Sequence, residues 1–209
     1  MQRVAVVDYG LCNVDSVVRA LQHCGAAPFL AHDAADIKAA DRIVLPGVGA
    51  FDAAMEQLDA ADLVSPLTDA VLGEGVPFLG ICLGMQLLAR SSEEGGPRAG
   101  FGWFDADVVR IEPGTDERVP HIGWNEVDAT SHETSSPLFG DIPDHTDFYF
   151  VHSFHMLCAD PADVLATVPF AGGVTAVVAR PPIYGVQFHP EKSQRHGLQL
   201  LRNFLTVSE

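Results

Sequence analysis

Apolar residues in the first ninety positions form short continuous runs that alternate with stretches of helical spacing. The continuous runs are RVAVVD at 3–8, PFLAH at 28–32, RIVLPG at 42–47 and VPFLGI at 76–81. A strand covered on both faces produces such a run, because neither face can be polar. Segments at 13–25, 33–40, 51–63 and 65–75 lie between the runs and are typical of helices. The alternation predicts a parallel sheet with helices on both faces.

The second half of the chain has a different pattern. Short strand-like runs separated by Gly, Pro and Asp lie at 106–111, 121–129, 147–153, 162–168, 175–180 and 182–188, and an amphipathic helix is predicted over 195–205. No linker or internal repeat interrupts the pattern. We therefore expect one domain over residues 1–209, of the α/β class: an open, mostly parallel sheet with flanking helices and added antiparallel strands.

The charge of the chain narrows the possible partners. It has 28 acidic residues against 12 basic ones, a formal net charge of −16. Such a field repels phosphate backbones, so nucleic acid is not an expected partner. The acidity fits either an ordinary solvated surface or adaptation to high intracellular salt, where screening removes the self-repulsion.

No apolar run is long enough to cross a bilayer, and the N-terminus lacks a signal-peptide layout, so a cytoplasmic protein without a membrane partner is expected. The four cysteines show no CxxC pair or zinc-like spacing, so neither a metal nor another cofactor is predicted.

One cysteine stands where a strand is predicted to end and a helix to begin. In GICLGMQ, Cys82 lies between two glycines, in the G-x-C-x-G form of a nucleophile elbow. The free N–H groups at a helix start would stabilise a thiolate, and the N–H of Leu83 could face a developing oxyanion. A buried structural cysteine in a glycine-rich turn is the alternative.

A thiolate nucleophile needs a base, and the base needs a group that orients it. His189 follows the predicted strand at 182–188, in the sequence His-Pro-Glu. Pro190 stiffens the link, so the Glu191 carboxylate can hold one imidazole nitrogen while the other faces the thiol. An ordinary turn would also explain this stretch, but together with the elbow it indicates a Cys-His-Glu triad.

Three blocks, LPGVGAF, GICLGMQ and YGVQFHPE, resemble the signatures of class I glutamine amidotransferases, over nearly the whole chain. The resemblance implies a flavodoxin-like fold and glutamine hydrolysis through a cysteinyl thioester. Cys82 would attack, His189 would move the proton to the departing ammonia, and Glu191 would orient the imidazole.

The same resemblance implies the roles of the groups around the triad. Leu83 with Val48 or Gly49 would form the oxyanion hole, and Gly47 and Gly49 would give that loop its freedom. Gln86, Gly49 and the backbone around Ser153 would hold the L-glutamine substrate.

The chain has no room for a synthase domain, so the ammonia acceptor must lie on a partner. DYGLCNVDSVVRAL, VPHIGWNEV, FYFVHSF and HPEKS resemble the amidotransferase subunits of imidazole glycerol phosphate synthases. These subunits form heterodimers with a (β/α)8-barrel cyclase subunit of histidine biosynthesis. By resemblance, the cyclase would contact Asn13, Trp124, Asn125, Tyr149 and Lys192.

The sequence departs from that pattern at Cys12, where a glycine is usual, and at Phe154, where a tyrosine is common. Other readings are a paralogous amidotransferase that feeds a different barrel-type synthase, a stand-alone hydrolase of γ-glutamyl compounds, and an inactive binding subunit. The last is disfavoured because Cys82, His189 and Glu191 are all present.

Overall fold

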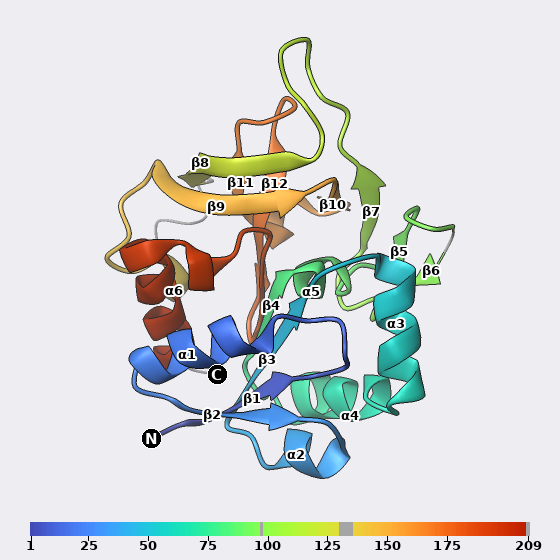
Figure 1. Ribbon diagram of the computed structural model, residues 1–209, viewed down its shortest axis with the longest axis vertical. Coiled ribbons are helices and arrows are strands. Elements are labelled where there is room, and N and C mark those ends of the chain that lie inside the picture. The colour runs from blue at the N-terminus through green and yellow to red at the C-terminus, as the bar shows by residue number, and fades with distance from the viewer. Residues whose placement is uncertain (97, 130–135, 208–209) are drawn as a thin grey trace.

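The computed structural model describes residues 1–96, 98–129 and 136–207 (Figure 1). Nine strands form the larger sheet: β1 Arg3–Val7, β2 Ala27–Ala31, β3 Arg42–Gly47, β4 Phe78–Cys82, β8 His121–Ala129, β9 Thr146–His152, β11 Val164–Val168, β12 Val174–Arg180 and β13 Ile183–Val186. Their order is β2-β1-β3-β4-β13-β12-β11-β8-β9. The first five are parallel neighbours, and every pairing from β13 to β9 is antiparallel. This mixed α/β sheet confirms the predicted fold class.

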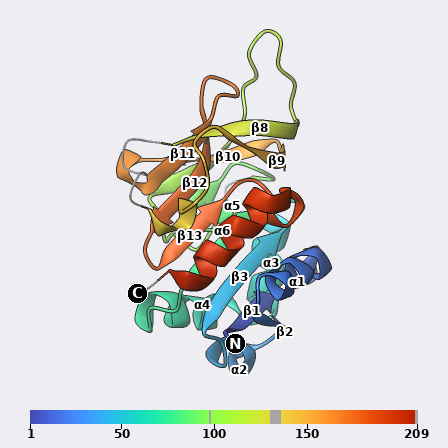
Figure 2. The same ribbon diagram turned by 90° about the vertical axis from the view of Figure 1, so that its left-hand side faces the viewer.

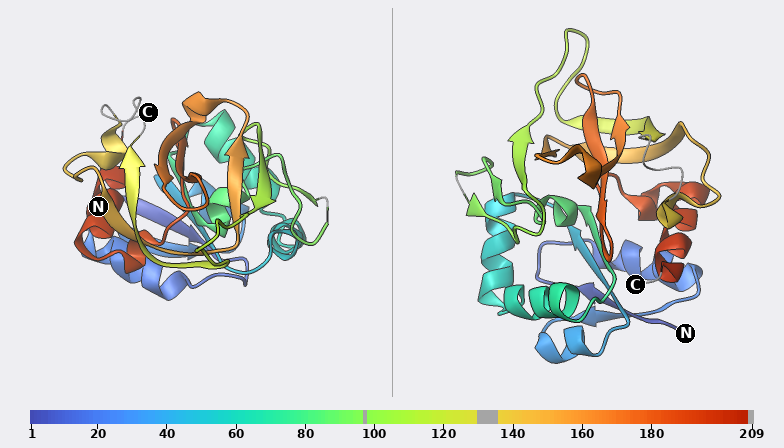
Figure 3. Two further views of the ribbon diagram at one scale, coloured as in Figure 1. Left: turned by 90° about the horizontal axis from the view of Figure 1, so that it is seen from above. Right: turned by 180° about the vertical axis from the view of Figure 1, so that it is seen from behind.

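A second sheet stands beside the antiparallel half. It contains β5 Ser91–Ser92, β6 Arg98–Ala99, β7 Ala106–Arg110 and β10 Phe154–Cys158, in the order β10-β7-β5-β6 (Figure 3). The prediction that 106–111 joins the core sheet was therefore wrong. The strand β10 was not predicted, because FHMLC follows β9 after Ser153 alone, without a glycine or proline to mark the boundary.

Helices cover both faces of the parallel strands, as predicted (Figure 2). Val4 and Val6 of β1 share a core with α1 (Val14–His23) and α6 (Gln194–Thr206), whereas the alternate residues Ala5 and Val7 share a core with the opposite helices. Those are α2 Ala34–Lys38, α3 Phe51–Ala60 and α4 Val64–Thr68, the last of which continues as a π-helical turn over Asp69–Gly73. Alternation along a strand thus assigns each side chain to one of two cores.

Two helical details differ from the prediction. Asn13 occupies the N-cap of α1, but its side chain makes no capping hydrogen bond. The helix after Cys82, α5, covers only Leu83–Gln86. It stops because the carbonyls of Leu87 and Ala89 accept hydrogen bonds from Phe101 and Gly102. A single turn keeps the free N–H groups at its start but has little of the dipole of a longer helix.

The parallel register brings the three signature blocks to one edge of the sheet. Gly47 at the end of β3 is the partner of Cys82 at the end of β4, and Ile81 pairs with Val186 at the end of β13. Carboxyl ends of parallel strands meet at one edge, where open α/β sheets place their ligands. Within the described ranges, no helix is both long and apolar enough for a transmembrane span.

Candidate active site

The backbone at Cys82 is strained. Cys82 has a φ of 55° and a ψ of −112°, a conformation that costs free energy for a residue with a side chain. The flanking glycines are sterically required. A Cβ on Gly80 would lie 2.5 Å from the Gly84 carbonyl oxygen, and one on Gly84 would collide with the Leu45 carbonyl. The glycines therefore allow β3, β4 and α5 to pack closely enough to hold the thiol at the strand end.

His189 and Glu191 form a buried pair at the end of β13. The Nδ1 atom of His189 lies 2.8 Å from Oε1 of Glu191, and the two side chains are only 4% and 3% exposed. They flank Pro190 at the start of the short 3-10 helix η5 (Pro190–Lys192). The Nε2 atom of His189 is buried and has no hydrogen-bond partner in the structure, so it is the nitrogen left for the thiol.

The charge of His189 depends on its neighbours. Burial disfavours the imidazolium, but the electrostatic interactions with Cys82 and Glu191 outweigh burial and raise the pKa of His189 to about 9. A protonated His189 is a proton donor already in place for a leaving amine. The structure therefore brings together the three predicted triad residues.

A buried amide network supports the nucleophile. Gln86 Nε2 donates to the Phe154 carbonyl and to Gln187 Oε1, both at 2.9 Å, and Gln187 Nε2 lies 3.7 Å from Cys82 Sγ. Both amide hydrogens of Gln86 are then used. Its carbonyl oxygen is the atom left to accept a hydrogen bond from a ligand, which defines how the predicted substrate contact of Gln86 would work.

The predicted oxyanion loop lies against the elbow, with Val48 and Gly49 in the same cleft as Cys82 and Leu83. A Cβ on Gly47 would lie 2.9 Å from that of Leu83, so this close approach requires glycine. The Val48 N–H donates to the Leu11 carbonyl at 3.1 Å. This N–H is therefore already engaged within the protein, next to Gly49, whose φ of 101° lies in the region that favours glycine.

The cleft at Cys82 has a volume of about 200 Å³. Ser153 lines it at the corner where the chain passes from β9 to β10; its carbonyl accepts from Ile111, which leaves its N–H and hydroxyl for a ligand. Glu94 also lines it, a residue that the sequence did not single out. Its carboxylate accepts from the Phe51 N–H, and burial raises its pKa. Glu94 lies in the acidic stretch SSEEGG, which carries no other signal of a site.

The residues predicted to meet a partner lie around the outer face of β8 and β9. Trp124 is 46% exposed and its ring lies 6.0 Å from that of Tyr149, while Lys192 Nζ lies 5.9 Å from the Tyr149 ring. Asn13 is exposed at the start of α1, which contacts η5. Asn125 alternates with Trp124 and points the other way, donating to His121 at 3.2 Å.

The residues at the two departures have defined surroundings. The Cys12 thiol lies 3.7 Å from the Val7 carbonyl oxygen and 3.6 Å from Asp8 Oδ1, and burial raises its pKa to about 11. Cys12 is therefore a neutral thiol with a packing role. Phe154 lines the cleft, and its carbonyl, rather than its ring, holds Gln86.

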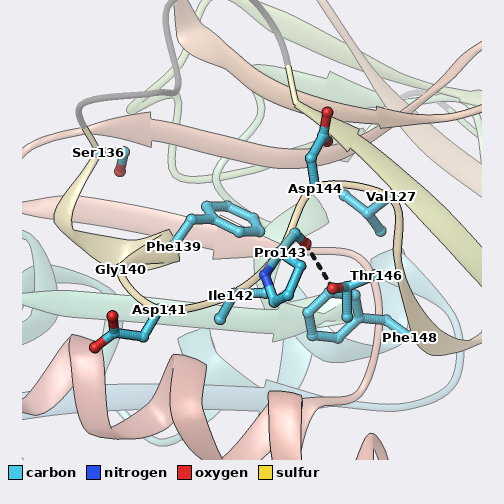
Figure 4. Close-up of a pocket in the computed structure, with 10 residues that line it drawn as sticks. All are labelled: Val127, Ser136, Phe139, Gly140, Asp141, Ile142, Pro143, Asp144, Thr146 and Phe148. Atoms are coloured by element: carbon cyan, nitrogen blue, oxygen red, sulfur yellow. Dashed lines mark hydrogen bonds between the residues drawn. The ribbon is translucent and has the colours of Figure 1, made fainter.

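A second hollow lies between β9 and the loop that precedes it (Figure 4). Its lining residues are Val127, Ser136, Phe139, Gly140, Asp141, Ile142, Pro143, Asp144, Thr146 and Phe148. None of them lines the cleft at Cys82, and none is a cysteine or histidine. Of these two hollows, only the cleft at Cys82 is lined by a cysteine and a histidine. Over the described part of the chain, no group of three or more His, Cys, Asp or Glu side chains could hold a metal ion.

Comparisons with known proteins agree with this geometry. Residues 5–207 match the family model of class-I glutamine amidotransferases, "Glutamine amidotransferase class-I". In the solved structures, PurLQS from Thermotoga maritima superposes with a TM-score of 0.75 at 18% identity and covers 98% of both chains. A glutamine amidotransferase from Thermotoga maritima gives 0.62 at 21% identity, over 93% of this chain and 78% of the other. The chain belongs to the class-I glutamine amidotransferases.

Curated relatives define the branch of that family. Imidazole glycerol phosphate synthase subunit HisH 2 of Pseudomonas aeruginosa is 44% identical over 98% of this chain and 99% of its own length. The subunit HisH of Thermosynechococcus vestitus is 45% identical over 98% of this chain and 96% of its own. Within its class, the chain is thus a member of the HisH family.

Proposed function

We propose that this chain is the glutaminase subunit of an imidazole glycerol phosphate synthase, acting in the cytoplasm in histidine biosynthesis. The observation that carries the proposal is the buried His189–Glu191 pair beside Cys82, at a glycine-flanked strand end. Membership of the family indicates the class of reaction, and the His189–Glu191 pair can move the protons that this reaction requires.

The reaction follows from the arrangement of the three residues. The Cys82 thiolate attacks the side-chain carboxamide carbon of glutamine, and the protonated Nε2 of His189 gives its proton to the departing ammonia. Water then hydrolyses the thioester, with neutral His189 taking the proton of the water, and glutamate leaves. Glu191 keeps Nδ1 hydrogen-bonded throughout, so Nε2 remains directed at the reacting atoms.

The surroundings of the triad suit glutamine in particular. The amino-acid end of the substrate carries an ammonium group. Glu94 would attract this charge, and the free carbonyl oxygen of Gln86 would accept a hydrogen bond from one of its N–H groups. The Ser153 N–H and hydroxyl suit the α-carboxylate. The Leu83 N–H would stabilise the oxyanion together with the loop N–H of Val48 or Gly49.

The partner would control the loop. The Val48 N–H donates to the Leu11 carbonyl in this structure, so it must leave that partner before it can stabilise an oxyanion. We propose that the cyclase binds across Asn13, Trp124, Tyr149 and Lys192 and favours a loop conformation in which this N–H is free, while Asn125, whose side chain faces His121, supports this surface from behind. Tyr149 is well placed to transmit this contact, because its carbonyl accepts from the His189 N–H at 2.9 Å. Ammonia would pass directly to the cyclase barrel.

The test is glutamate release from glutamine, by the chain alone and with the cognate cyclase bound to its phosphoribulosyl formimino substrate. The proposal predicts weak release alone and strong stimulation by the loaded cyclase. Full activity without the cyclase would favour an independent hydrolase. No release in either state would contradict the proposed function.

A further inference from the structure

A pair of buried histidines lies beside the cleft, outside the triad. His121 of β8 and His152 of β9 are direct neighbours in the sheet register and are only 5% and 6% exposed. The Nδ1 atom of His121 lies 2.9 Å from Nε2 of His152. The His121 ring stacks on Phe150 and Phe170, with centroids 4.9 and 4.1 Å away, which fixes its plane. His152 itself lines the cleft.

Hydrogen-bond chemistry determines where the protons of this pair lie. His152 Nδ1 is 2.9 Å from the Phe154 carbonyl oxygen, which can only accept, so Nδ1 carries the hydrogen. Nε2 of neutral His152 is then an acceptor, and His121 Nδ1 must donate to it. The remaining nitrogen, His121 Nε2, accepts from the Asn125 amide at 3.2 Å. Each bond in the series fixes the tautomer of the next ring.

A proton added to either ring would break this series. Nε2 of His152 accepts from Nδ1 of His121, so protonation of His152 would set two N–H groups face to face, and protonation of His121 would require the Asn125 amide to turn over. Burial lowers the pKa of both histidines, and His155 and His189 near His152 act in the same direction. Glu117 near His121 and the Phe154 carbonyl at His152 act in the opposite direction without prevailing. The pair is neutral, unlike His189.

The series ends at the groups that form the glutamine pocket. The Phe154 carbonyl that accepts from His152 also accepts from Gln86 at 2.9 Å. Gln86 in turn bonds Gln187, whose amide nitrogen lies 3.7 Å from Cys82 Sγ. The neutral histidines thus hold one of the two acceptors that orient the Gln86 amide.

We propose that His121 and His152 are positioning residues for substrate recognition: they hold the Phe154 carbonyl so that Gln86 presents its free oxygen to glutamine. This inference rests on the proposed function, since it assigns the pocket to glutamine. The histidines themselves exchange no proton with the substrate. They orient the Phe154 carbonyl, and their hydrogen bonds stay uncharged beside the charged triad.

Two polar substitutions of His152 separate this role from simple packing. His152→Asn places an N–H near the former Nδ1 and keeps the bond to the Phe154 carbonyl. His152→Gln places its amide near the former Nε2 and keeps the bond to His121 instead. Both retain a polar side chain of similar length, so both should fold. His23→Leu, on the exposed side of α1, is the control for loss of a histidine.

The measurement is the rate of covalent labelling of Cys82 by two reagents. The first, 6-diazo-5-oxo-L-norleucine, carries the amino-acid end of glutamine; the second, iodoacetamide, reports thiol reactivity alone. His152→Gln should lower the rate with the glutamine analogue about tenfold, as expected for a misplaced hydrogen-bond acceptor, while His152→Asn stays within about threefold of wild type. Iodoacetamide rates should stay within about twofold in both variants, since the triad is untouched.

With the loaded cyclase, His152→Gln should raise KM for glutamine more than it lowers kcat. Equal rates for the Asn and Gln variants with the analogue, or parallel loss with both reagents, would overturn the positioning role. If wild-type Cys82 were not labelled by the glutamine analogue even in the complex with the loaded cyclase, the proposed function would fail instead, which keeps the two failures distinct.

Discussion

Two buried histidines border the cleft, and they differ in charge for a reason that the structure makes visible. His189 and His152 are 3% and 6% exposed, so burial penalises the charged form of each. His189 faces a carboxylate and a thiol, and its pKa is raised to about 9. His152 faces another imidazole and a carbonyl, and its pKa is lowered by burial to about 3. The partner, rather than the depth of burial, decides the charge.

The difference separates the two tasks of the site. The charged pair can transfer a proton, which the reaction requires when ammonia leaves. The neutral pair cannot release or gain a proton near neutral pH, so its hydrogen bonds keep one direction. The charged pair can therefore change its protonation during the reaction while the neutral pair beside the same cleft keeps its protons in place.

Cys82→Ala gives the largest expected effect. The nucleophile is lost, so glutamine-dependent turnover of the complex should fall by at least about 10³-fold, whereas turnover with free ammonia should persist. Cys24→Ala, at the end of α1, is the matched control and should keep glutamine-dependent turnover. Survival of that turnover in Cys82→Ala would show that the nucleophile is misassigned.

Glu191→Gln removes the carboxylate that sets His189 apart from His152. We expect kcat to fall about 10² to 10⁴-fold, as when the orienting acid of a triad is lost. The pKa of His189 should fall, so the alkaline limb of the activity profile should move from about pH 9 to lower pH. Glu74→Gln, on an exposed loop, controls for loss of an acid. An unchanged alkaline limb would contradict the role given to Glu191.

The same variant tests the linkage to stability. Because the pKa of His189 in the folded state lies above its ordinary value of 6.5, the charged pair stabilises the fold fully below about pH 6.5. That contribution is lost as the pH rises through about 9. Urea unfolding of the wild type should show this dependence, and Glu191→Gln should show less of it. If both proteins showed the same pH dependence of the free energy of unfolding, the His189–Glu191 pair would not be the source of this stabilisation.

Asn125→Asp gives the neutral pair a carboxylate of its own. The aspartate would accept from His121 Nε2, so His121 should gain a proton while its Nδ1 still donates to His152. We expect the pKa of His121 to rise, with only a few-fold change in labelling of Cys82 by the glutamine analogue, because the bond to Phe154 is kept. An NMR titration of His121 checks the pKa. A His121 that stays neutral at pH 6 would show that burial, and not the partner, dominates.

Sequence patterns predicted the elements that follow local rules. The continuous apolar runs identified four of the five parallel strands, and the glycines around Cys82 identified the elbow, because both signals reside in adjacent residues. The fifth, β13, was predicted among the antiparallel additions but pairs in parallel with β4. The pattern did not reveal that α5 ends at Gln86, since the hydrogen bonds that end it come from Phe101 and Gly102. It also missed β10 and the second sheet, which depend on long-range pairing.

The site shows the same division. His189 and Glu191 are two residues apart and could be paired from sequence. Glu94 could not be placed, because it reaches the cleft from a distant segment without a motif of its own. The His121–His152 pair arises from strand register alone, which a single sequence does not specify. The direction of the Val48 N–H is likewise a property of the folded loop.

The most direct test of the contrast between the two pairs is an imidazole nitrogen–proton NMR titration of the intact chain. The account predicts that His189 is doubly protonated at neutral pH and loses its proton near pH 9. His152 should stay neutral down to below pH 5, and His121 should have a pKa below its ordinary value, with the hydrogen of each neutral ring on Nδ1. Titration of all three near pH 6.5, or hydrogen on Nε2 of His152, would contradict it.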